Sequence, residues 1–180
     1  MRIIGGEFRS RILADFKGQD VRPTSDRARE ALFNILSFKI RGARVLDLFS
    51  GSGAIGLESL SRGALEVVFN DFAKDSVAII KKNVSALKIP TEKATIYNYD
   101  YALCLQLVKG TFDFIFIDPP YLLDYGKNAL EVIAKRNLLS AGGSAVYERD
   151  CAFECEIEGL EKYDERKYGK AYFTFFRKKV

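Results

Sequence analysis

An apolar run in the middle of the chain ends abruptly in four residues, Asp118, Pro119, Pro120 and Tyr121. The run itself, FDFIFI at 112–117, has the composition of a buried strand. Proline has no backbone N–H to donate, so two prolines in succession end the strand and stiffen the exit. The sequence therefore predicts a rigid loop that holds a carboxylate, a carbonyl and an aromatic ring at the end of a strand.

These groups suit methyl transfer to an exocyclic amine of a nucleic-acid base. Such an amine is a poor nucleophile because its lone pair is delocalised into the ring. The Asp118 carboxylate and the Pro119 carbonyl could accept its two N–H groups, in positions that the prolines fix beforehand. Tyr121 could stack on the base, and closeness to the methyl donor would contribute further. The alternative interpretation is a rigid strand exit with a surface acid and a packing tyrosine.

A second motif, DLFSGSGAIG at 47–56, carries Gly51, Gly53 and Gly56 in the spacing G-x-G-x-x-G. It lies between a predicted strand and a predicted helix, where open α/β sheets bind ligands. Asp71 follows Gly51 by 20 residues and could accept hydrogen bonds from ribose hydroxyls. The motif predicts a nucleotide-containing ligand. The alternative is a tight strand–helix turn that binds nothing.

Asp47 favours one ligand over another. A carboxylate directly before the glycines would repel a pyrophosphate, as in NAD, but would attract the ammonium group of an amino-acid moiety. S-adenosylmethionine therefore suits the loop better than a dinucleotide. Asp100 could accept from an adenine amino group, cap the helix that follows it, or do both. The cofactor-binding candidates are Asp47, Phe49, Ser50, Gly51, Gly53, Asp71, Asp100 and Tyr101.

The residue content excludes several other mechanisms. The chain has no histidine, which removes a Ser-His-Asp triad. Its three cysteines, Cys104, Cys151 and Cys155, lack framework spacing and fit reduced thiols. A Cys-based metal site needs about four ligands, so we expect no metal. No run approaches the ~18 apolar residues of a membrane span and no signal peptide is evident, which favours a cytoplasmic protein.

The net charge of +4 is unevenly distributed. Residues 1–44 hold ten Lys or Arg against five Asp or Glu, and residues 162–180 hold seven against two. The middle, 45–161, holds eleven against seventeen. If the two basic ends meet on one face, that face would attract a polyanion. The alternative is a scatter of solvated charges.

The elements that must position these residues alternate between strand and helix. We expect strands at 43–49, 65–71, 93–100, 112–118 and 143–150, with helices at 54–63, 74–88, 101–110 and 125–139. This order predicts an α/β fold with a parallel sheet and right-handed crossovers. Strands near 160–168 and 171–177 predict an antiparallel C-terminal hairpin, which makes seven strands. Residues 1–42 are expected to form a basic hairpin and a helix that pack on the core, 43–180.

The strings RIIGGEFRSR, RPTSDRAREALFNIL, DLFSGSGAIGLESLSRGA, FDFIFIDPPY and KYGKAYFTFF together resemble the RsmD family. These bacterial enzymes methylate the N2 amine of one guanine in small-subunit (16S) ribosomal RNA. The N-terminal strings are the most specific part, because all class I methyltransferases share the glycine loop. The resemblance implies a Rossmann-like class I methyltransferase fold and S-adenosylmethionine as cofactor. It also implies a 16S rRNA substrate, alone or in an assembling small subunit, and a monomer without a membrane partner is our default.

Carried over by position, Asp118, Pro119, Pro120 and Tyr121 match the family's catalytic motif, and Asp47, Gly51, Gly53 and Asp71 match its cofactor site. The nucleic-acid-binding candidates are Arg9, Arg11, Arg22, Arg27 and Arg29, of which the last three are expected to be exposed near a helix start. One departure is Asn70, where the family commonly has an apolar residue.

Three other functions stay open at this point. An adenine-N6 methyltransferase would use the same acceptor chemistry. A nucleotide-binding oxidoreductase would bind NAD and leave the Asp118 motif without a role. A catalytically silent RNA-binding module would keep the basic ends but would not need Asp118.

Overall fold

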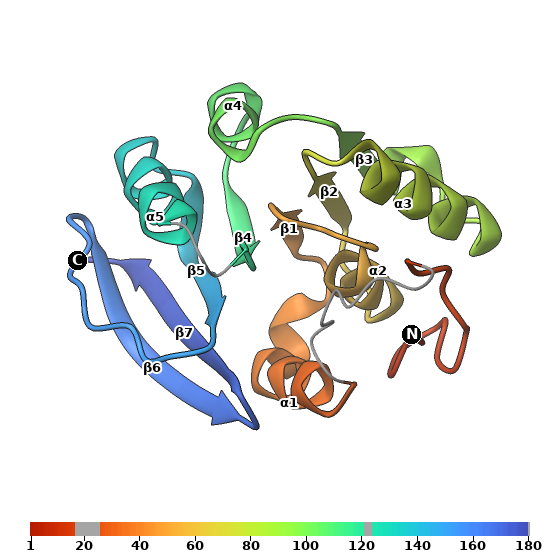
Figure 1. Ribbon diagram of the computed structural model, residues 1–180, viewed down its shortest axis with the longest axis horizontal. Coiled ribbons are helices and arrows are strands. Elements are labelled where there is room, and N and C mark those ends of the chain that lie inside the picture. The colour runs from red at the N-terminus through yellow and green to blue at the C-terminus, as the bar shows by residue number, and fades with distance from the viewer. Residues whose placement is uncertain (17–25, 121–123, 180) are drawn as a thin grey trace.

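A single sheet of seven strands forms the centre of the molecule in the computed structural model, which describes residues 1–16, 26–120 and 124–179. The strand order is β3-β2-β1-β4-β5-β7-β6. The strands are β1 (Arg44–Asp47), β2 (Glu66–Asn70), β3 (Ala94–Tyr97), β4 (Phe112–Ile117), β5 (Leu139–Arg149), β6 (Leu160–Tyr168) and β7 (Ala171–Lys178). The first five are parallel, whereas β7 runs antiparallel to β5 and β6. The expected parallel sheet with an antiparallel C-terminal hairpin is confirmed (Figure 1).

Five α-helices lie in the described residues, one before β1 and four between successive strands from β1 to β5. They are α1 (Asp26–Leu36), α2 (Ala54–Ser61), α3 (Lys74–Ala86), α4 (Tyr101–Leu107) and α5 (Tyr125–Lys135), and two short 3-10 turns, η1 (Ser37–Ile40) and η2 (Thr91–Lys93), complete the set. The predicted boundary between α5 and β5 was wrong: the helix was expected to reach residue 139 and the strand to begin at 143, but α5 ends at Lys135 and β5 begins at Leu139. The helix expected at 101–110 also ends early, at Leu107. Asn137 adopts a left-handed conformation, with φ of 55°. The Leu138 N–H bonds back to the Ile133 carbonyl, which closes the helix.

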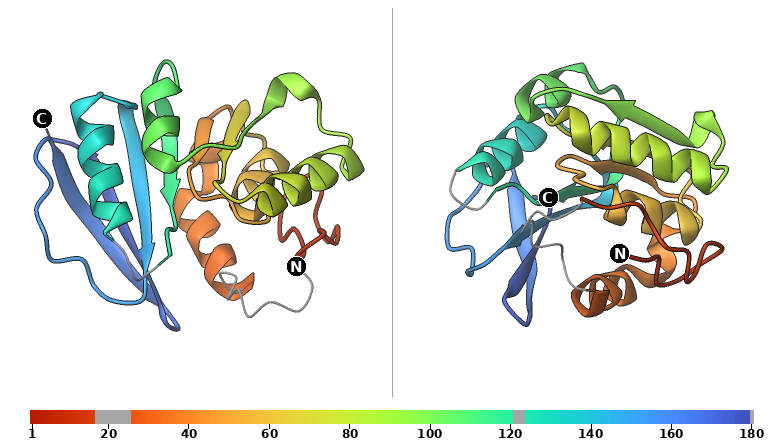
Figure 2. Two further views of the ribbon diagram at one scale, coloured as in Figure 1. Left: turned by 45° about the horizontal axis from the view of Figure 1, so that its top comes forward. Right: turned by 45° about the vertical axis from the view of Figure 1, so that its right-hand side comes forward.

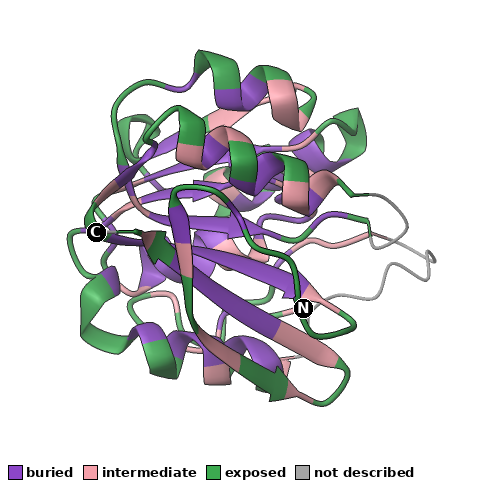
Figure 3. Ribbon diagram, turned by 90° about the vertical axis from the view of Figure 1, so that its left-hand side faces the viewer, coloured by how far each residue is buried: buried purple, intermediate pink, exposed green. Residues whose placement is uncertain are grey.

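The sheet separates two apolar clusters, because successive side chains of a strand point to opposite faces. Alternate residues of β4, Phe114 and Phe116, belong to the cluster that also holds side chains of α1, α2 and α3. Ile115 and Ile117 belong to the other cluster, with side chains of α4 and α5. The parallel strands are covered on both faces, as their nearly continuous apolar sequences require. In Figure 3 the strands in the middle of the molecule are buried, while much of the edge strand β6 is not.

The N-terminal segment forms less of a hairpin than expected. A single antiparallel bridge joins Arg2 to Ile12, and turns occupy the residues between them. The segment is held on the core by Glu58 of α2, whose carboxylate accepts from the Ile4 and Gly5 N–H groups at 2.8 and 2.9 Å. Figure 2 shows this segment beside α2. The division of the chain at residue 42 stays a prediction.

No helix in the described ranges is long and apolar enough to cross a membrane.

Candidate active site

Three carboxylates from neighbouring strands lie on one face of the sheet. Asp47 ends β1, Asp118 follows β4 and Glu148 lies near the end of β5. The β4–β5 register pairs Ile117 with Tyr147, so its continuation sets Asp118 beside Glu148. By the same alternation all three carboxylates point away from α4 and α5.

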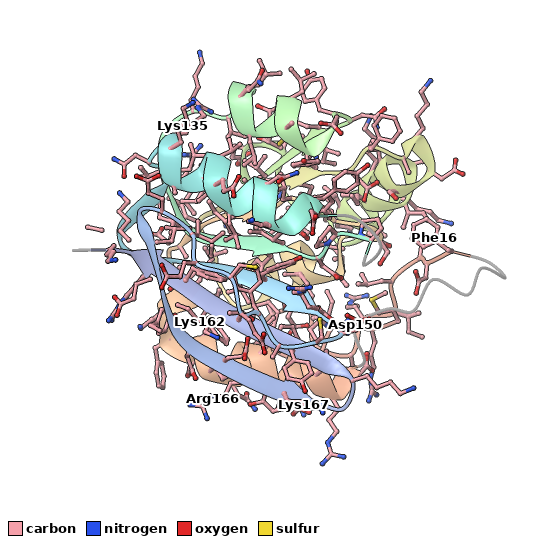
Figure 4. The ribbon with its side chains drawn as sticks, turned by 60° about the vertical axis from the view of Figure 1, so that its left-hand side comes forward. Phe16, Lys135, Asp150, Lys162, Arg166 and Lys167 are labelled. Carbon is pink, nitrogen blue, oxygen red and sulfur yellow. The ribbon has the colours of Figure 1, made fainter. Side chains whose placement is uncertain are left out.

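A cavity opens on this face at the carboxyl ends of the strands. It measures about 760 Å³, including the open space at its mouth. Its lining combines the three carboxylates, the loop after β1, part of α1 and the N-terminal segment. The lining residues among our candidates are Asp47, Phe49, Ser50, Gly51, Asp118 and Arg29. Phe16 also lines the cavity. In Figure 4 it lies toward the same side of the molecule as Asp150, which follows β5, whereas Lys135 lies toward the opposite side.

The glycine loop turns as the motif predicts. Gly51 has φ of 54°, and a Cβ added there would meet no atom within 4 Å, so its surface is open. A Cβ on Gly56 would instead lie 2.2 Å from the Phe69 ring, so this glycine allows α2 to pack closely on β2. The two glycines thus differ: Gly51 borders open space in the cavity, whereas Gly56 brings helix and strand together.

Asp47 is buried at the base of the loop. Its Oδ2 accepts a hydrogen bond from the Gly56 N–H at 3.0 Å. Burial raises the pKa of Asp47 from 3.8 to about 7, against the lowering effect of that hydrogen bond, and the Asp71 charge adds to the rise. A cation bound beside Asp47 would favour its ionised form.

Asp71 supports the same loop from the end of β2. Its Oδ2 accepts from the Gly51 N–H at 2.8 Å, and its Oδ1 accepts from the Ala73 N–H at 2.9 Å. The neighbouring Asn70 is buried, and its amide donates to the carbonyls of Leu48 and Tyr99, both at 3.1 Å. The unusual Asn70 therefore ties the loops after β1 and β3 together, a role that an apolar residue could not perform.

Asp118 has a strongly perturbed carboxylate. The residue is exposed and lines the cavity. Burial raises the pKa of Asp118 well above its usual range, and the charges of Glu148 and Asp47 raise it further. Of the two prolines that follow, Pro119 is buried and Pro120 is exposed, while the Tyr121 of the predicted motif lies outside the described residues.

Aromatic rings line the region between β1 and α4. The ring of Tyr101 lies 5.4 Å from that of Phe49 and 5.0 Å from that of Tyr125. Asp100 is the N-cap of α4, because its carboxylate accepts from the Ala102 N–H at 2.8 Å. The capping interpretation of Asp100 is thus confirmed, and contact with an adenine stays a prediction.

Comparison with known proteins places nearly the whole chain in one family. The family model described as Conserved hypothetical protein 95 matches residues 1–177. Ribosomal RNA small subunit methyltransferase D of Haemophilus influenzae is 36% identical over 141 residues, which are 77% of this chain and 73% of that protein. The protein of the same name from Escherichia coli is 39% identical over 135 residues, or 73% and 67% of the two chains.

The chain belongs to the RsmD family.

The family's fold extends over the entire chain. The solved structure of yhhF from Escherichia coli is 26% identical and superposes with a TM-score of 0.88 over 100% of this chain and 98% of that one. The sequence-based prediction of the RsmD family, with a class I methyltransferase fold, is therefore confirmed.

Arg29 is a correction to the predicted nucleic-acid surface of this RsmD-family chain. The sequence led us to expect an exposed side chain, but Arg29 is only 1% exposed. Its guanidinium lies under the N-terminal segment, where it donates to the Arg2 carbonyl at 2.5 Å and to Asp26 at 2.9 Å. Burial lowers the pKa of Arg29, and nearby carboxylates oppose that effect. Within the described part of the chain its Nε has no hydrogen-bond partner.

The other predicted arginines have different positions. Arg9, Arg11 and Arg27 are exposed, as a phosphate contact requires, and Arg22 lies outside the described residues. In the ranges that the structure describes, no three His, Cys, Asp or Glu side chains are arranged to hold a metal ion.

Sequence reasoning missed Glu148 as a member of the site. Glu148 is only 6% exposed and lines the cavity with Asp118. Its signal was the alternation of SAVYER, which puts Glu148 on the face opposite Tyr147. The alternation alone did not identify Glu148 as a site residue, because only the register of β5 against β4 sets Glu148 beside Asp118.

Proposed function

We propose that this RsmD-family protein methylates the exocyclic N2 amine of a guanine in small-subunit ribosomal RNA, with S-adenosylmethionine as methyl donor. The observation that carries the proposal is that the Asp118 carboxylate lines the same cavity as the glycine loop. An amine held by Asp118 and a cofactor held by the loop would therefore meet in one space. The printed names of the relatives, ribosomal RNA small subunit methyltransferase D, support rRNA as the substrate.

The residues around the loop fit the cofactor's amino-acid end. Asp47 offers a carboxylate for the ammonium group. Arg29 offers a buried Nε–H, without a partner among the described residues, for the carboxylate. We therefore propose that Arg29 binds the carboxylate of the cofactor and not an RNA phosphate.

The nucleoside end of the cofactor would meet Asp71 and Tyr101. Asp71 already accepts two backbone N–H groups, but a carboxylate offers about four acceptor sites, which leaves room for ribose hydroxyls. Tyr101 and Phe49 supply apolar surface for the adenine. When bound, S-adenosylmethionine supplies an electrophilic methyl group on a positively charged sulfur.

Asp118 would orient the target amine and accept the proton that it loses. Its carboxylate accepts one N–H of the guanine amine, and the Pro119 carbonyl accepts the other, as the motif implies. The raised pKa of Asp118 also makes it a stronger proton acceptor than an ordinary aspartate. It is therefore suited to take the proton that the amine loses on methylation.

Exposed arginines would hold the RNA around the cavity. Arg27 of α1 and the N-terminal Arg9 and Arg11 are exposed on elements next to the cavity lining. An rRNA substrate, naked or in an assembling subunit, implies a cytoplasmic protein, and we expect a monomer, which light scattering after gel filtration can check.

Mass spectrometry of rRNA from a deletion strain tests the function. We expect one N2-methylguanosine of the small-subunit rRNA to disappear and to return when the gene is restored. Loss of an N6-methyladenosine would instead support the adenine alternative. Unchanged methylation of every rRNA nucleotide would contradict the proposal.

Calorimetry tests the cofactor separately. We expect the purified protein to bind S-adenosylhomocysteine and not NADH. Binding of NADH alone would overturn the assignment to methyl transfer.

A further inference from the structure

Glu148 is a buried acid in the cavity that the proposed chemistry does not use. It lies on β5, directly next to β4, on the same face as Asp118. Its charge acts on Asp118, so the two carboxylates are close. Both acids line the cavity and lie on neighbouring strands, so a ligand in the cavity would meet two adjacent acceptors. This arrangement suits a ligand with more than one hydrogen-bond donor.

Guanine presents such a pair of donors on its Watson–Crick edge. Its N1–H lies next to the N2 amine, so two acceptors placed side by side match both groups. Adenine places an acceptor, its own N1, next to its N6 amine. A carboxylate at that position would face a lone pair and repel it. Two neighbouring carboxylates therefore match guanine and oppose adenine.

We propose that Glu148 accepts the N1–H of the target guanine while Asp118 accepts its N2–H, and that Glu148 thereby selects guanine. This inference rests on the proposed function. Neighbouring strands lie about 4.8 Å apart, so the two side chains can converge on adjacent donors. A carboxylate has about four acceptor sites, so Glu148 can accept from a ligand in addition to a partner within the protein.

The position of Glu148 makes the recognition strict. The side chain is fixed on a regular strand, with β4 on one side and β7 on the other. Val146 of the same face and Phe173 of β7 form the apolar wall around it. A site built to bond one group rejects an analogue lacking that group by about 10⁴-fold, because a buried polar atom would be left unpaired. We expect Glu148 to supply a large part of such discrimination.

The test uses 2-aminopurine, a base that keeps the 2-amino group but has an acceptor at N1. A short rRNA stem-loop is made with guanine or with 2-aminopurine at the methylated position. For the wild-type protein we expect the single-turnover rate to fall at least 100-fold on 2-aminopurine. For Glu148→Gln we expect the rate on guanine to fall and the rate on 2-aminopurine to rise, because the new amide can donate to N1.

Control variants separate recognition from folding. Glu148→Ala should be slow on both RNAs and show little preference, whereas Glu131→Gln, on an exposed part of α5, should keep the wild-type preference. Each variant is checked for S-adenosylhomocysteine binding by calorimetry, since a folded cofactor site must survive. If Glu148→Gln no longer binds S-adenosylhomocysteine, the test uses Glu148→Ala, and the deciding quantity is its rate on the guanine RNA divided by its rate on the 2-aminopurine RNA.

Two results would overturn the inference. One is a wild-type rate on 2-aminopurine within threefold of that on guanine. The other is a Glu148 variant that keeps the wild-type ratio between the two RNAs. If the wild-type protein methylates neither RNA nor the full rRNA, the proposed function fails instead, and the two failures are thus distinguishable.

Discussion

Asp118 lies between two other carboxylates, Asp47 and Glu148, and its behaviour depends on both. Each neighbour raises the pKa of Asp118, which keeps its proton affinity high. A bound cation next to Asp47 would offset part of this accumulated negative charge. The same residues that make the cavity unfavourable in its empty form therefore favour a positively charged ligand.

Asp118→Asn tests the acceptor role directly. The amide has nearly the same size but presents an N–H₂ group and accepts protons poorly. We expect single-turnover methylation to fall by roughly 100- to 1,000-fold, as for loss of one preorganised polar group. Calorimetry should show S-adenosylhomocysteine affinity within a few fold of wild type. A rate within twofold of wild type would show that Asp118 is not an acceptor in the reaction.

Asp47 should link stability to pH. Its pKa rises from 3.8 to about 7 on folding, so the folded protein holds a proton that the unfolded chain releases. The contribution of Asp47 to the unfolding free energy is therefore fully present below pH 4 and is lost as the pH rises to about 7. We therefore expect Asp47→Asn to exceed wild type in unfolding free energy at pH 8 by up to ~4 kcal/mol, and to lose that advantage at pH 3.5.

Urea unfolding at several pH values measures this difference. The Asp113 carboxylate accepts from the Arg44 N–H and the Ser140 hydroxyl, so Asp113→Asn is a control that should not reproduce the gain at pH 8. An Asp47→Asn curve parallel to wild type across the whole pH range would mean that Asp47 is ionised in the folded protein.

At the scale of elements, the contact between α2 and β2 holds the glycine loop in shape. Gly56→Ala would place a methyl group 2.2 Å from the Phe69 ring, which cannot move freely in the core. We expect the unfolding free energy to fall by about 1–3 kcal/mol and cofactor affinity to fall with it. Thermal unfolding and calorimetry measure the two effects.

A second substitution checks the cause. Phe69→Leu removes part of the ring that the new methyl group meets. The double variant should therefore be destabilised by less than the sum of the two single variants. Additive losses would show that the contact with Phe69 is not the reason for a glycine at position 56.

The order of elements was predictable because it depends on local pattern. The alternation of helix and strand periods is strong from β1 to β5, and the prolines and glycines mark most boundaries. The end of α5 was missed because Asn137, rather than a glycine, takes the left-handed position. Site membership was harder to predict, since the burial of Arg29 and the closeness of Glu148 to Asp118 depend on contacts between distant parts of the chain.

At the scale of the molecule, the basic ends of the chain meet only in part. The termini lie on opposite sides of the molecule (Figure 1), but α1 of the basic N-terminal region contacts β6 of the basic C-terminal hairpin. Exposed Arg27 thus belongs to a helix of one basic region that contacts a strand of the other. An extended nucleic acid would find positive charge there.

Arg27→Ala tests whether this surface meets phosphate. We expect weaker rRNA binding and a slope of log affinity against log salt that is shallower by about 0.7–0.9, the effect of one phosphate contact. Filter binding at four salt concentrations measures the slope. Lys135→Ala, at the end of α5 and on the opposite side of the molecule from the cavity-lining Phe16 in Figure 4, is the control and should leave the slope unchanged. An unchanged slope for Arg27→Ala would exclude a phosphate contact.

The strand order also has a consequence for biosynthesis. β1 pairs with β4, so Asp47 gains Asp118 as a neighbour only after β2 and β3 have been made, and Glu148 joins later still. At about 5–20 residues per second, the interval between Asp47 and Glu148 leaving the ribosome is on the order of 5–20 s. Until β4 emerges, one edge of β1 has no partner strand. The three acids become neighbours last, so a nascent chain carries a formed glycine loop before it can carry a complete cavity.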